Sequence, residues 1–176
     1  MNTLFDAQGN KVPPRPTWSE ESKEIIRIAL DKLYSSGNCH FEEHERDDLA
    51  SSLASYYMPY CDEFSLAKDF EFDGWDVNRE FVDQLENIGG YLIEAERSLV
   101  KEWAKKFVPV PPFEIGAVLN GFDWREQCEA VGTITGICNS PATYLVKFPD
   151  NDENSRRLIK FEDAVLADEV EKCQSR

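Results

Sequence analysis

Apolar residues recur at the spacing of an amphipathic helix in three stretches before residue 108, so we expect a helical region there. The first helix begins near Thr17, where Thr17 and Glu20 stand at capping-box spacing, and it stops at Gly37. Its inward stripe is predicted to be Ile25, Ile26, Ala29, Leu30 and Leu33. The second helix covers roughly residues 42–58 and ends before a proline.

The third predicted helix follows Asp76, a good N-cap residue, and runs to Phe107. Its apolar positions alternate steps of three and four residues, and Gly89-Gly90 interrupts them with a kink or a closely approaching neighbour. Such a row of apolar residues could form a coiled coil with the same helix of a second copy, which would make a dimer. The central helix of a small bundle is the prediction that we favour.

The pattern changes after the prolines at 109, 111 and 112, where short runs rich in β-branched and aromatic residues begin. These predict strands at 113–119, 130–138, 143–148 and 156–161. One helical turn at 162–164 and a closing strand at 165–167 complete the pattern. We therefore predict an α+β protein with an acidic helical domain at 1–108, made of about three helices, and a small β-rich domain at 109–176.

The β-rich third resembles a small SH3-like barrel of the Tudor or KOW kind. The residues that carry the resemblance are Phe113–Val118, Val131–Ile137, Tyr144–Phe148 and Ile159–Ala164. The resemblance implies binding of peptides, nucleic acids or other domains rather than catalysis. The chain differs from SH3-like barrels that bind nucleic acid, because it contains twelve acidic and seven basic residues after residue 108. Phe122, Trp124 and Tyr144 are the candidate contacts if exposed, although each could equally be a core residue.

A run of acid between Phe41 and Asp76 dominates the charge of the chain, which is −15 over 176 residues. Eleven acids stand there against only Arg46 and Lys68. Like charges at this density repel and cost stability, which makes the run a candidate recognition surface. The predicted partner-binding residues in it are Glu42, Glu43, Glu45, Asp47, Asp48, Asp62, Glu63, Asp69, Glu71, Asp73, Trp75 and Asp76, and Trp124 and Tyr144 are added from the barrel.

The same run contains an approximate EF-hand calcium loop. Asp69, Glu71 and Asp73 take its first, third and fifth positions, Gly74 its turn, and Glu80 the twelfth. A single EF-hand-like calcium-binding protein is therefore one alternative. The competing interpretation of residues 69–73 is an exposed strand with the acids outward and the phenylalanines inward.

No catalytic motif stands out, so we predict a protein that is not an enzyme and needs no cofactor. The segment His40-Phe-Glu-Glu-His44 fits the H-x-x-E-H spacing of inverted zinc peptidases, but it is short enough to arise by chance in acidic sequence. Five cysteines without a C-x-x-C pair, no signal peptide and no long apolar stretch favour a cytoplasmic location away from membranes.

These observations predict an acidic inhibitor or interaction protein that docks on a basic surface of another protein. Direct binding of nucleic acid is disfavoured by the negative charge. Where the basic site belongs to a nucleic-acid-binding enzyme, the acids would act as a nucleic-acid mimic, and the chain is similar in type to phage anti-defence and toxin-immunity proteins. The alternative is a scaffold or adaptor that binds through its barrel.

Overall fold

The computed structural model describes residues 2–123 and 127–167. By its contacts the chain divides into two compact units. Residues 15–102 form the helical unit. The β unit combines the N-terminal arm, up to Pro14, with the chain from Trp103 onward. The predicted division into domains at residue 108 stays a prediction.

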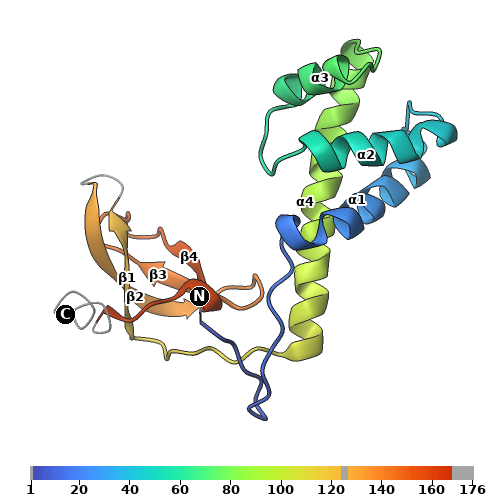
Figure 1. Cartoon of the computed structure of the whole chain (residues 1–176). Helices are drawn as coiled ribbons and strands as arrows, with labels where there is room; N and C mark the ends of the chain where they lie inside the picture. The colour runs from blue at the N-terminus through green and yellow to red at the C-terminus, as the bar shows by residue number, and fades with distance from the viewer. Residues whose placement is uncertain (1, 124–126, 168–176) are drawn as a thin grey trace, which may run out of the picture. The chain divides into compact units, whose positions relative to one another are not determined.

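Four α-helices rather than three build the helical unit, with α1, α2 and α3 arranged along α4 (Figure 1). They are α1 (Trp18–Ser35), α2 (Arg46–Tyr56), α3 (Glu63–Phe72) and α4 (Arg79–Phe107), and a 3-10 turn at Glu43–Glu45 precedes α2. All four helices contribute buried side chains to one apolar core. The predicted small bundle is therefore confirmed.

Helix α1 follows its sequence pattern closely. The five apolar residues predicted to face inward are all buried. Ser35 ends the helix, and Gly37 adopts φ +75°, the left-handed conformation that glycine accepts at low cost. The capping box at Thr17 was wrong, because the side chain of this N-cap residue accepts no capping hydrogen bond. A capping box exists instead at Glu42 and Glu45, ahead of α2.

Helix α3 is the element that the sequence pattern did not predict. Asp62 caps it by accepting a hydrogen bond of 2.9 Å from the Ser65 backbone N–H. Leu66, Ala67 and Phe70 then share the buried side, while Phe72 is 90% exposed. The exposed-strand interpretation of 69–73 was therefore wrong, since a strand would have placed Phe70 and Phe72 on the same face.

Helix α4 continues without a break through Gly89 and Gly90. A Cβ built on either glycine meets no atom within 4 Å, so no neighbour approaches the helix there. The N-cap is Asn78 rather than Asp76, because Asn78 Oδ1 accepts a hydrogen bond of 2.9 Å from the Phe81 N–H. Phe81, Leu85, Ile88, Leu92 and Ala95 are buried in the core of the helical unit.

The β unit contains a curled four-stranded antiparallel sheet, a half-barrel, in the order β1-β2-β3-β4 (Figure 1). The strands are β1 (Val118–Asp123), β2 (Cys128–Ile137), β3 (Thr143–Lys147) and β4 (Arg157–Lys160), followed by a 3-10 turn at Phe161–Asp163. The first strand was predicted at 113–119, but the turn at Gly116, where φ is +97°, delays it to Val118. The predicted closing strand is reduced to a bridge between Leu119 and Leu166.

The N-terminal arm belongs to the β unit. Asn2 Nδ2 donates to the carbonyl of Ala164, and the Val110 N–H donates to the carbonyl of Phe5 over 2.8 Å. Trp103 Nε1, near the end of α4, donates to the carbonyl of Pro13 over 3.0 Å. The N-terminal arm is therefore tied by hydrogen bonds to the part of the β unit that begins at Trp103.

Candidate protein-binding surface

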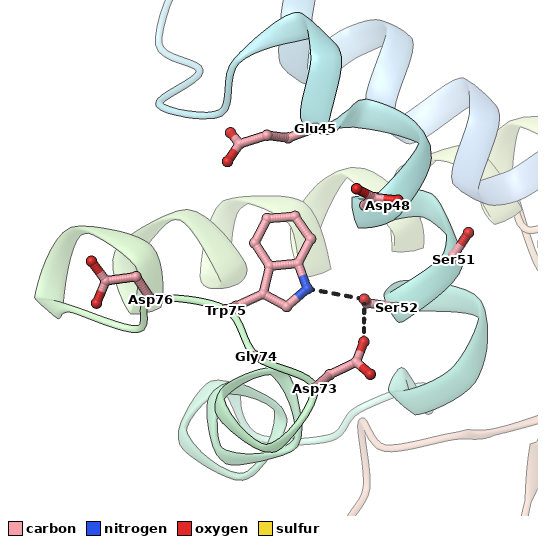
Figure 2. A pocket seen from close by; sticks show the side chains of 8 residues that line it. All are labelled: Glu45, Asp48, Ser51, Ser52, Asp73, Gly74, Trp75 and Asp76. Carbon is pink, nitrogen blue, oxygen red and sulfur yellow. Dashed lines mark hydrogen bonds between the residues drawn. The ribbon is translucent and has the colours of Figure 1, made fainter.

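Four of the predicted acidic residues meet around Trp75, in the loop between α3 and α4. They border a hollow of about 440 Å³, which we call the Asp48 hollow. The described lining consists of Glu45, Asp48, Ser51, Ser52, Asp73, Gly74, Trp75 and Asp76 (Figure 2). It contains four carboxylates and no lysine or arginine. A positively charged group entering this hollow would therefore meet attraction on several sides.

A chain of hydrogen bonds fixes the Trp75 indole at the edge of this hollow. Trp75 Nε1 donates to Ser52 Oγ over 3.1 Å, and Ser52 Oγ donates to Asp73 Oδ2 over 2.8 Å (Figure 2). Tyr56 also donates to Asp73, over 3.3 Å. Desolvation, followed by the negative charge of Asp73, raises the pKa of the Tyr56 hydroxyl. Asp73 therefore ties the end of α3 to α2, which is a structural role.

A second pocket, of about 230 Å³, shares Glu45, Trp75 and Asp76 with the Asp48 hollow. We call it the Gln84 pocket. Its lining consists of His40, Phe41, Glu45, Trp75, Asp76, Asn78, Glu80, Phe81 and Gln84. Figure 2 shows Glu45 and Asp76 to one side of the indole, while Asp48 and Ser52 lie to the other. The two pockets therefore make one acidic surface with Trp75 in it, which we call the Trp75 surface.

Other predicted acids do not line either pocket, and several have structural partners. Glu42 forms the capping box with Glu45 of the pocket linings, and Glu43 pairs with Arg46 over 3.3 Å. The hydrogen bonds that Asp62 accepts from Ser65 hold the pKa of its carboxyl below the usual value. The remaining four, Asp47, Glu63, Asp69 and Glu71, lie on α2 and α3 outside the pocket linings.

The residues of the predicted calcium loop do not form a loop. Asp69 and Glu71 lie in the last turns of α3, Asp73 and Gly74 follow its end, and Glu80 lies in the first turn of α4. The His40–His44 segment likewise lacks the helix that would place both histidines on one face, because residues 40–42 are not helical. Within residues 2–123 and 127–167, no three His, Cys, Asp or Glu side chains come together to hold a metal ion.

The barrel candidates have different outcomes. Tyr144 is fully buried, at 0% exposure, and its hydroxyl exchanges hydrogen bonds of 2.8 and 2.9 Å with the Phe113 backbone. The expectation of an exposed Tyr144 contact was therefore wrong, because the ring belongs to the sheet core. Phe122 is half-buried. Trp124 lies outside the described residues.

Sequence reasoning missed Ser52 and Gln84, both buried polar residues beside Trp75. Ser52 lies three residues after Leu49 on the inward side of α2, and Gln84 lies three residues after Phe81 on the inward side of α4. Both are polar residues at positions where the helical period of apolar residues predicts a core side chain. That mismatch is the signal that could have identified them.

No protein-family model matches this chain, and no curated protein and no solved structure matches it. None of the helices between residues 2 and 167 combines the length and apolar character that crossing a bilayer requires.

Proposed function

We propose that this chain is a non-enzymatic acidic protein that binds a basic surface of another protein through the Trp75 surface. The observation that supports it best is the Asp48 hollow, whose described lining has four carboxylates, a half-buried tryptophan and no basic side chain. Opposite charge guides a basic partner to the surface and fixes its register, while an aromatic side chain provides a desolvated anchor.

Exposed aromatic residues close in sequence to the hollow support the same function. Phe64 and Phe72 of α3 are 64% and 90% exposed, and Tyr60, just before this helix, is 85% exposed. Aromatic side chains are enriched at protein interfaces relative to the rest of the surface. In this proposal they contact apolar parts of the partner around its basic site.

One form of this function is mimicry of nucleic acid. A partner whose basic site normally holds phosphates would be inhibited, because the carboxylates would occupy the same site. Nuclease-treated lysate passed over the immobilised chain, followed by elution with duplex DNA, tests this form. A partner that DNA displaces supports mimicry, whereas a partner that only salt displaces limits the proposal to binding of a basic protein.

Paired variants test the surface itself. Asp48→Asn with Asp76→Asn removes two negative charges from the Trp75 surface, and Glu114→Gln with Asp163→Asn removes two from exposed positions of the β unit. Bound partner eluted at increasing salt is quantified by mass spectrometry for each form. Loss of retention in the first pair alone supports the proposal. Equal retention by both pairs contradicts it.

An adaptor that binds through an SH3-like sheet is the second candidate function. Val131 and Leu158 are 48% and 59% exposed, and the strand register places both on the outward face of the sheet. An apolar outward face favours a second protein as its ligand. The double variant Val131→Thr with Leu158→Thr distinguishes this function from binding through the Trp75 surface. A partner that this variant loses, and that Asp48→Asn with Asp76→Asn keeps, binds the sheet.

A further inference from the structure

The side-chain oxygen of Gln84 lacks a hydrogen-bond donor in a place where water is largely excluded. Gln84 is only 5% exposed and lies in the second turn of α4. Its Oε1 is buried and has no hydrogen-bond partner. Buried polar atoms are nearly always paired, so an unpaired one in a residue that lines a pocket is consistent with a ligand that donates a hydrogen bond there.

The groups around this oxygen define what such a ligand must offer. Asp76 and Glu80 are exposed carboxylates that line the same pocket. The rings of Phe41, Trp75 and Phe81 also line the pocket, with centroids 5.3 to 5.9 Å apart. The rest of the lining consists of His40, Glu45 and Asn78. A water molecule would satisfy the oxygen alone. An organic cation would satisfy the oxygen, the carboxylates and the aromatic rings together.

We propose, on the basis of the function proposed above, that the Gln84 pocket receives the guanidinium group of an arginine side chain of the partner protein. A guanidinium carries five N–H donors in one plane, so it can donate to the Gln84 amide oxygen and to a carboxylate at the same time. Its flat face stacks on aromatic rings. A quaternary ammonium group has no N–H to donate, and the lysine ammonium is a compact, strongly hydrated charge.

The size of the pocket agrees with this ligand. At about 230 Å³ it is smaller than the roughly 300–1,000 Å³ typical of sites for drug-sized molecules. It therefore suits one side chain rather than a whole metabolite. The adjoining Asp48 hollow then offers further carboxylates to basic groups that neighbour this arginine on the partner surface.

The test uses N-acetyl-L-arginine amide as the probe and the isotope-labelled full chain. We expect saturable NMR shifts at the Trp75 indole N–H and the Gln84 side-chain NH₂. N-acetyl-L-citrulline amide has nearly the same shape without the charge, and we expect it to bind at least about tenfold more weakly. N-acetyl-L-lysine amide is expected to bind more weakly than the arginine probe.

Variants locate the probe. Gln84→Met removes the acceptor at similar volume, and Glu80→Gln removes an exposed charge. Each is expected to weaken arginine binding, by about tenfold for the acceptor. Glu114→Gln, which removes an exposed charge of the β unit outside both pocket linings, is the matched control and should leave binding unchanged. Dispersed spectra of each variant verify its fold, and Glu80→Gln tests the pocket independently of the buried position.

Three results would each overturn the arginine site: no saturable shift, equal binding of the citrulline probe, or binding unaltered by both Gln84→Met and Glu80→Gln. The proposed function is judged separately. A partner retained equally by wild type and Gln84→Met, but lost with Asp48→Asn and Asp76→Asn, would refute the arginine site and leave the acidic interaction surface in place.

Discussion

Two glycines of the sheet, Gly121 and Gly132, leave the space that the Phe148 ring fills. A Cβ at Gly132 would lie 2.7 Å from Val146 Cγ1 and 2.8 Å from Phe148 Cε2, and one at Gly121 would overlap the same ring. Phe148 and Val146 are buried, so their side chains have little room to move away. We expect Gly121→Ala and Gly132→Ala each to destabilise the protein by about 1–3 kcal/mol, which urea denaturation would measure.

Gly136, on the same strand β2, supplies the control for these variants. A Cβ there meets its nearest atom, Leu145 Cδ1, at an ordinary 3.7 Å. Gly136→Ala should therefore change the free energy of unfolding much less than Gly132→Ala. Equal effects of the two substitutions would mean that the crowding around Phe148 is not what requires glycine.

The unpaired oxygen of Gln84 has a consequence for stability as well as for binding. In the absence of a partner, a buried acceptor without a donor costs about 1–3 kcal/mol. Gln84→Met replaces it with an apolar side chain of similar size, so we expect the free chain to become more stable in urea denaturation. A less stable variant would show that the oxygen has a donor within the folded chain.

At the scale of elements, α3 shows where sequence periodicity is informative and where it is not. The long stripes of α1 and α4 extend over several turns. The five predicted inward residues of α1 are buried, and α4 buries Phe81, Leu85, Ile88, Leu92 and Ala95 at the same spacing, while Leu99 further along is half-buried. Helix α3 is only 10 residues long, and its acids on both sides of Phe70 also fit a strand or a calcium loop. Asp62 caps α3 and so favours the helix over a strand or a calcium loop. From the sequence, Asp62 was treated only as one of the negative charges, and no cap was predicted there.

The Asp62 cap makes the stability of α3 depend on pH. Hydrogen bonds from Ser65 lower the pKa of this carboxyl in the folded protein, so the cap contributes stability above the unfolded pKa of about 4. That contribution is lost as the pH falls through the lower, folded pKa. Asn caps helices without titrating, so in Asp62→Asn stability should fall less steeply as the pH drops below about 4. Thermal melts at each pH check this, and parallel curves would contradict it.

Two interior glycines lower the stability of helix α4, and substituting them should raise it. Gly89 and Gly90 lie in its interior with open space beside each Cβ position. Alanine restricts the unfolded chain and favours the helix, so each substitution should stabilise by about 0.4–1 kcal/mol. Gly37→Ala is the contrasting control, because φ is +75° there and alanine should destabilise. A loss of stability in Gly90→Ala, measured by thermal unfolding, would indicate a helix bend that needs glycine.

For the molecule as a whole, the fold was more accessible from sequence than the site. The α+β order follows from local periodicity and turn residues, and the curl of the sheet was expected from the resemblance to small SH3-like barrels. The Trp75 surface requires α2 to meet the loop before α4, and this depends on the Trp75–Ser52–Asp73 hydrogen bonds between residues more than 20 positions apart. Composition pointed to the acidic run, but it could not separate Asp48 and Asp76 at the pockets from acids that cap helices.

The most direct test of the proposed function compares partner retention from nuclease-treated lysate on three immobilised forms of the full chain. These are the wild type, Asp48→Asn with Asp76→Asn, and Glu114→Gln with Asp163→Asn. We predict one basic partner that the wild type and the β-unit pair retain to the same salt concentration and that the Trp75-surface pair releases earlier. The same partner eluting at one salt concentration from all three would contradict binding through the Trp75 surface.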